Sequence, residues 1–138
     1  AVLKNLHESN KSLAGKRVLI VDDDMRNIFA LATVLEEEAM DIVWADNGRD
    51  AIARVAADPE IKLVLMDIMM PGTLSGLEVC RCIKANPALK HTKVIMLTAR
   101  GQARDREAGE AVGADEYLVK PFSPLQLIET IERLMPAA

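Results

Sequence analysis

The chain contains few aromatic residues and few cysteines, and both scarcities limit what it can be. Aromatic residues make up 3% of the 138 residues, so aliphatic side chains and methionine must fill the core. The two cysteines, Cys80 and Cys82, lie two positions apart in a predicted helix. Side chains at that spacing point to different sides and cannot easily form a disulfide with each other. We therefore expect two reduced thiols, as in a cytoplasmic protein.

Long apolar runs are also missing. No stretch approaches the roughly 20 residues that a membrane-spanning helix needs, and no secretory signal is visible. The formal net charge is −4, which argues against general binding to nucleic acid or to an anionic membrane. We expect a cytoplasmic protein that binds neither directly.

The length of 138 residues suits one domain with a substantial core and is small for two. Residues 1–15 carry little strand signal and end in Ser-Leu-Ala-Gly, so we predict a linker or N-terminal extension there. Regular alternation of apolar segments begins at Lys16. The predicted domain therefore spans residues 16–135, and residues 136–138 form a tail.

Five apolar strands alternate with five amphipathic helices along this domain. The strands are predicted at 17–22, 41–45, 61–66, 93–98 and 116–119, and the helices at about 28–35, 51–56, 77–85, 103–112 and from 124 onward. Ser123 is the predicted N-cap of the last helix, with Pro124 at its first position. Such alternation predicts an α/β fold, a doubly wound parallel sheet with helices on both faces.

Two of the predicted strands run directly into acidic residues. The first is followed by Asp22, Asp23 and Asp24, and the third by Asp67. Ligand sites in open parallel sheets lie outside the carboxyl ends of the strands, so Asp22, Asp23 and Asp67 converge there if the two strands are neighbours. Carboxylates that close repel one another unless a cation or a proton lies between them. Oxygen ligands favour a hard divalent ion, so the pattern predicts a Mg²⁺ site.

Two more strands end in side chains that suit the same site. Thr98 ends the fourth strand and offers a hydroxyl donor, and Lys120 follows the fifth and offers a fixed positive charge. Phosphoryl transfer to a carboxylate requires a nucleophilic aspartate, a metal and a cation that neutralise the phosphoryl oxygens. The residues at the strand ends therefore fit phosphoryl chemistry on an aspartate.

Four separated motifs resemble the receiver domain of two-component response regulators. They are Leu19-Ile20-Val21-Asp22-Asp23, Leu65-Met66-Asp67-Ile68-Met69-Met70-Pro71, Met96-Leu97-Thr98-Ala99 and Tyr117-Leu118-Val119-Lys120-Pro121-Phe122. The resemblance covers Lys16 to Leu134. It implies a flavodoxin-like sheet with strand order 2-1-3-4-5, the order that a well-known member of this family exemplifies.

The resemblance also implies roles for the acidic residues. Asp67 would accept a phosphoryl group from a histidine kinase or a small phosphodonor. Asp23 and Asp67 would bind Mg²⁺ directly together with the backbone carbonyl of Met69, and Asp22 would act partly through water. The protein would catalyse its own phosphorylation and dephosphorylation without being a turnover enzyme.

The remaining motif residues would transmit the signal. Lys120 would contact the phosphoryl group, and its peptide bond to Pro121 would be cis. Thr98 and Tyr117 resemble the family's switch pair, which would alter the face made by the helix at 103–112, the last strand and the last helix. The implied partners are a histidine kinase or hybrid kinase and a downstream protein or attached output domain, and a weak homodimer is compatible with the family.

Three other classes compete with this interpretation. A haloacid dehalogenase-type phosphohydrolase needs two aspartates two apart followed by a specific tail, which neither acidic motif here has. A flavodoxin-like FMN binder needs a hydroxyl- and glycine-rich phosphate loop after the first strand, where this chain has three aspartates that would repel FMN. A degenerate receiver that acts only as a protein-interaction module remains the alternative.

Overall fold

The computed structural model describes residues 13–68, 75–89, 91–99 and 113–135. Its strands are β1 (Arg17–Val21), β2 (Asp41–Ala45), β3 (Ile61–Asp67), β4 (Lys93–Ala99) and β5 (Glu116–Lys120). Its helices are α2 (Met25–Glu36), α3 (Gly48–Ala57), α4 (Gly76–Ala85) and α6 (Pro124–Leu134), with a single 3-10 turn η1 (Pro87–Leu89). The five predicted strands and four of the five predicted helices are confirmed, and the helix predicted at 103–112 lies outside the described residues.

The strands form one parallel sheet in the order β2-β1-β3-β4-β5. This is the doubly wound, flavodoxin-like order that the family resemblance implies, so the predicted fold class is confirmed. Strand order changes direction after β1, because β1 lies between β2 and β3. The carboxyl ends of β1 and β3 therefore meet at the point where such sheets form ligand sites.

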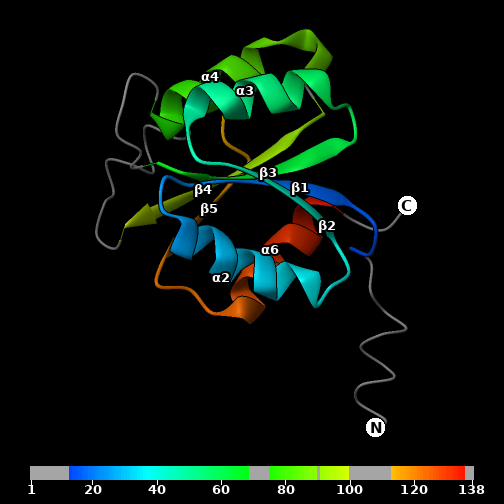
Figure 1. The fold of residues 1–138 in the computed structure, drawn as a ribbon, viewed down its shortest axis with the longest axis vertical. Coiled ribbons are helices and arrows are strands. Elements are labelled where there is room, and N and C mark those ends of the chain that lie inside the picture. Colours follow the sequence, from blue (N-terminus) through cyan, green and yellow to red (C-terminus); the bar gives the residue numbers. More distant parts are fainter. Residues whose placement is uncertain (1–12, 69–74, 90, 100–112, 136–138) are drawn as a thin grey trace, which may run out of the picture.

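The sheet is covered on both faces, with α3 and α4 on one side and α2 and α6 on the other (Figure 1). Alternate residues of β1 pack into different cores: Leu19 and Val21 belong to the α3/α4 core, whereas Val18 and Ile20 belong to the α2/α6 core. All four side chains are fully buried. Burial on both faces explains why the central strands read as continuous apolar runs.

Each described helix begins at a polar N-cap whose side chain accepts a backbone N–H of the first turn. The caps are Asp24, Asn47, Ser75 and Ser123. The Ser123 cap is reinforced by the side chain of Gln126, which accepts the Ser123 N–H at 2.8 Å, and Pro124 follows it as predicted. Of the helices that the structure describes, none combines the length and the apolar character needed to cross a membrane.

The two cysteines lie on different sides of α4, as their spacing predicts. Cys80 is buried against the sheet and Cys82 is exposed, and neither forms a disulfide. Burial raises the pKa of Cys80 to about 11, so its thiol stays protonated. Cys80 therefore serves as a small core residue.

A half-buried ion pair joins α4 to the turn before β5. Lys84 Nζ lies 2.6 Å from Asp115 Oδ2 and also donates to the Thr92 carbonyl at 2.9 Å. The same Asp115 oxygen accepts the Val94 N–H at 2.8 Å. One carboxylate thus fixes the start of β4, the entry to β5 and the end of α4.

We expect replacement of Asp115 by Ala to lower the free energy of unfolding by about 2 kcal/mol, because it removes two charge-assisted hydrogen bonds and leaves Lys84 partly buried without its anion. Urea unfolding measures this difference. Asp41→Ala is the matched control, because it breaks a more exposed pair with Arg17 and should cost about 0.5 kcal/mol or less. Equal losses in the two variants would contradict the role given to Asp115.

Candidate functional site

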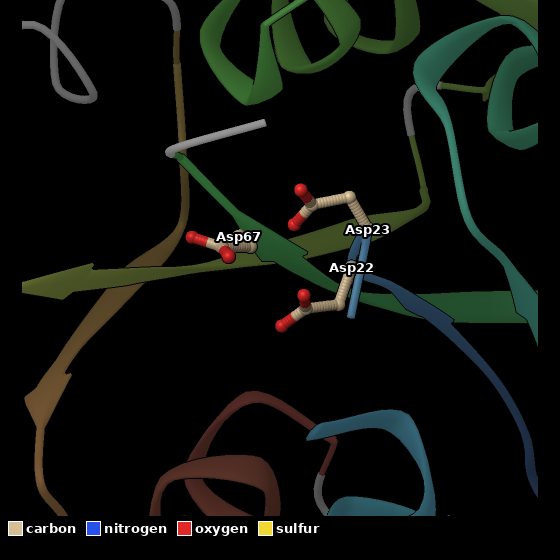
Figure 2. Close-up of side chains that lie close together, drawn as sticks. All are labelled: Asp22, Asp23 and Asp67. Atoms are coloured by element: carbon tan, nitrogen blue, oxygen red, sulfur yellow. The ribbon is translucent and has the colours of Figure 1, made fainter. Parts of the chain in front are cut away.

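Strand register brings the acidic residues of β1 and β3 to one edge of the sheet. Val21 lies opposite Met66, so Asp22 and Asp67 follow at neighbouring positions. One carboxylate oxygen from each of Asp22, Asp23 and Asp67 lies within 4.8 Å of the others (Figure 2). The structure thus places side by side the three carboxylates that the strand-end pattern singles out.

The three carboxylates differ in direction and burial. Asp22 continues the alternating row of Val18 and Ile20 and points toward α2 and α6, whereas Asp23 points to the opposite side (Figure 2). Asp22 is 1% exposed and Asp67 is 6% exposed, while Asp23 is open to solvent. The cluster therefore consists of two buried carboxylates and one that is accessible to solvent.

The buried carboxylate of Asp22 is only half satisfied by the protein. Its Oδ1 accepts the Asp24 N–H at 2.9 Å, while its Oδ2 is buried without a hydrogen-bond partner among the described residues. Burial raises the pKa of Asp22, and the nearby charge of Asp67 raises it further; the Asp24 N–H and Lys120 act in the opposite direction. An ionised Asp22 is thus costly unless another positive group approaches.

Lys120 provides the positive charge nearest to the cluster among the described residues. Its Nζ lies 3.4 Å from Asp67 Oδ2 and 4.0 Å from Asp22 Oδ2. The Lys120–Pro121 peptide bond is cis, as the resemblance implies. Lys120 forms ion pairs with Asp22 and Asp67, and the three carboxylates together exceed its one charge by two formal negative charges.

Thr98 and Tyr117 lie on the same face of the sheet. Tyr117 pairs with Met96 in the β4–β5 register, and Thr98 is two residues beyond Met96, so all three face the α3/α4 side. Thr98 is buried at 3% exposure, and the Tyr117 ring packs partly buried against the α3/α4 core. Their role as a switch pair remains a prediction that this arrangement permits.

The structure adds Gly76, which the sequence interpretation did not identify. Gly76 begins α4, and its N–H donates to the Ile68 carbonyl at 3.3 Å. A Cβ there would collide with the backbone carbonyl oxygen of Asp67 and would lie 2.9 Å from the Ile68 Cα. Glycine at this position lets α4 pack directly on the strand end that carries Asp67. The sequence signal was a glycine in a helix immediately after its Ser75 cap.

Asn27 is the second residue that the sequence interpretation missed. It lies in the first turn of α2 and lines the same cavity as Asp22 and Lys120. Its side chain favours the charged form of Asp22 and so partly offsets the rise in the pKa of that carboxyl that burial causes. No motif in the chain marks this asparagine, because its distance from Asp22 depends on how α2 packs.

The donor set fits a hard divalent cation. All candidate side-chain ligands are carboxylate oxygens, the ligands that Mg²⁺ prefers, and the orphaned Asp22 Oδ2 supplies a buried acceptor for such an ion or its water. Asp23 adds an accessible ligand. The predicted fourth ligand, the backbone carbonyl of Met69, lies outside the described residues, as does the loop that follows it.

Comparison with known proteins identifies the family. The profile of the response regulator receiver domain matches residues 18–132, so the chain belongs to this family of signalling domains, which are not turnover enzymes. The transcriptional regulatory protein ResD of Bacillus subtilis is 42% identical over 122 residues, covering 88% of this chain and 49% of ResD. Protein PilG of Pseudomonas aeruginosa is 37% identical, covering 89% of this chain and 90% of PilG. The chain therefore spans about half the length of ResD.

Solved structures agree with this assignment. The chemotaxis protein CheY4 of Vibrio cholerae superimposes with a TM-score of 0.80 at 30% identity, covering 88% of this chain and 99% of CheY4. The receiver domain of the sensor histidine kinase PA1611 of Pseudomonas aeruginosa, with magnesium in its active-site cleft, gives a TM-score of 0.80 at 27% identity over 88% of this chain and 98% of that one.

We expect Asp23→Asn to raise the metal-free free energy of unfolding by about 1 kcal/mol, because it removes one of the mutually repelling charges. It should also abolish most of the stabilisation by Mg²⁺. For the unmodified protein, that stabilisation should reach about 1.4 kcal/mol at a Mg²⁺ concentration tenfold above the dissociation constant. Thermal and urea unfolding, with and without Mg²⁺, measure both effects.

The matched control is Asp46→Asn, which removes an exposed carboxylate just beyond β2 and outside the cluster. It should leave the response to Mg²⁺ unchanged. An unaltered Mg²⁺ response in Asp23→Asn would place the metal elsewhere.

Proposed function

We propose that this receiver domain accepts a phosphoryl group on Asp67 in a Mg²⁺-dependent reaction and thereby switches its signalling state. The observation that carries the proposal is the convergence of Asp22, Asp23 and Asp67 beside the Lys120 ammonium, 3.4 Å from Asp67. Membership of the receiver family and the magnesium in the cleft of the PA1611 relative support it.

Each acidic residue has a distinct part in this proposal. Asp67 is both the phosphoacceptor and a metal ligand. Asp23 and the backbone carbonyl of Met69 would bind the ion directly, and the buried Asp22 would hold it partly through water. Mg²⁺ bound there would neutralise the charge that builds up on the phosphoryl oxygens.

The transfer itself is a substitution at phosphorus. An oxygen of the Asp67 carboxylate forms a bond to phosphorus as the bond from phosphorus to the donor breaks, and the donor's imidazole nitrogen or acetate oxygen keeps the electron pair. Lys120 holds its positive charge against the incoming phosphoryl oxygens, and Thr98 donates its hydroxyl to one of them. Hydrolysis of the acyl phosphate by water resets the domain.

Phosphorylation supplies a stimulus for the switch. A phosphoryl group adds charge and acceptor oxygens that attract the Thr98 hydroxyl. Movement of Thr98 would open space on the α3/α4 face of the sheet, on which Tyr117 also lies. In this proposal Tyr117 turns inward and alters the face that includes β5 and α6.

Family membership implies a histidine kinase as phosphodonor and an output domain or partner as target. We propose that the receiver occupies residues 16–135 as a cytoplasmic domain, with 1–15 as a linker and 136–138 as a tail. A degenerate receiver that only binds proteins is the second candidate, and it would not be phosphorylated on Asp67.

Incubation with acetyl phosphate and Mg²⁺ should add one phosphoryl group to the protein, at Asp67. The reason is that Asp67 combines strand-end placement with contact to Lys120. Intact-mass spectrometry measures the product, and omission of Mg²⁺ should abolish it. Labelling that persists in Asp67→Asn would place the nucleophile on another residue, and no labelling of the unmodified protein would favour the degenerate receiver.

Lys120→Ala should slow phosphorylation roughly a hundredfold, because it removes the fixed charge that stabilises the transferring group. It should leave Mg²⁺ binding in place, because the carboxylates that bind the metal remain. Time courses of acetyl phosphate labelling and a Mg²⁺ titration separate the two effects. Lys62→Ala, which removes an exposed lysine near the start of β3, is the control and should behave as the unmodified protein does.

A further inference from the structure

A groove lies between α2 and α6 and opens beside the acidic site. Its volume is about 450 Å³, within the range of sites for small organic ligands. Its apolar lining comes from Leu31 and Val34 of α2, Phe122 and Leu127 on the other wall, and Leu97 of β4. Asp22, Asn27 and Lys120 are its polar residues.

Asp22 is an unusual component of an apolar groove. It is 1% exposed, points to the α2/α6 side, and has a buried Oδ2 with no hydrogen-bond partner in the described part of the chain (Figure 2). A buried acceptor without a donor is costly, so a ligand that donates a hydrogen bond to this oxygen would recover that cost. The groove therefore combines an apolar body with a buried carboxylate oxygen that accepts no hydrogen bond from the described residues and lies 4.0 Å from Lys120 Nζ.

The sign of the charge decides which ligands can use this group. Asp22, Asp23 and Asp67 together outweigh the Lys120 ammonium, which already lies 3.4 Å from Asp67. An anionic head group would meet an excess of negative charge, whereas a cationic one would be attracted. Because Asp22 is almost inaccessible, the head group must also be small.

We propose that this groove binds a small organic cation with an apolar body, such as an aryl-alkyl ammonium. The ammonium would donate to Asp22 Oδ2, and the body would lie along Leu31, Val34 and Phe122. Because the organic cation and Mg²⁺ both interact with the Asp22 carboxylate, each weakens the binding of the other. Such a ligand would hold the domain in its unphosphorylated state, a consequence that rests on the proposed function, whereas the binding itself does not.

Matched ligands test the proposal on the unmodified protein. Phenylpropylammonium and phenylpropanol have nearly the same shape and differ in charge, and backbone NMR shifts report binding of each without Mg²⁺. The ammonium should bind with a dissociation constant of about 1 mM, and the alcohol at least about tenfold more weakly. The shifted resonances should belong to residues of α2 and α6, and Mg²⁺ should weaken the binding of phenylpropylammonium. Equal affinity of the two ligands, no binding of the ammonium, or indifference to Mg²⁺ would overturn the proposal.

Two phenylalanine substitutions on one helix locate the site. Ala30→Phe adds a ring at the wall of the groove, and Thr33→Phe adds the same ring on an exposed position of α2 that does not line it. Ammonium binding should weaken about tenfold or more in Ala30→Phe and stay unchanged in Thr33→Phe. The same effect in both variants, or none in Ala30→Phe, would place the ligand elsewhere.

Acetyl phosphate labelling then tests the consequence. At limiting Mg²⁺, phenylpropylammonium should slow labelling of Asp67 and phenylpropanol should not. Unchanged labelling under saturating ammonium would overturn the antagonism. Failure to label at all, with normal ammonium binding, would instead contradict the proposed function and leave the groove site standing.

Discussion

The mutual repulsion of Asp22, Asp23 and Asp67 is the constraint that the rest of this structure has to overcome. Three carboxylate oxygens within 4.8 Å of one another, with one nearby ammonium, do not stay together by their own interactions. They are held by the strands that carry them, whose apolar residues are buried in cores on both faces of the sheet. Core packing thus offsets an unfavourable arrangement of charge that a cation can relieve.

Neighbouring parts of the fold keep this arrangement rigid. Gly76 brings α4 against the backbone of Asp67, and the Asp24 cap of α2 presents its N–H to Asp22. Both contacts use backbone groups, which leaves the second oxygen of Asp22 for an added ligand. The difference in burial between Asp22 and Asp23 gives the site one face toward solvent and one toward the α2/α6 groove.

Much of the fold could be predicted because its signals are local in the sequence. Apolar runs ending in Asp22 and Asp67 identify both the strands and their carboxyl edge, and Ser123-Pro124 identifies a helix start. Strand order came from family resemblance, since right-handed crossovers alone allow several orders. Asn27, Gly76 and the groove were not predicted, because each depends on how a helix packs on the sheet; of these, Gly76 alone left a sequence signal, a glycine directly after the Ser75 cap.

The most direct test of the account is a crystal structure of the protein with Mn²⁺ in place of Mg²⁺, located by its anomalous scattering. Mn²⁺ binds the same oxygen ligands as Mg²⁺. Its anomalous signal distinguishes the ion from a water molecule, so its position can be assigned directly. The account predicts one strong peak bounded by the carboxylates of Asp22, Asp23 and Asp67. A fully loaded crystal with its metal elsewhere, and none among these three residues, would contradict it.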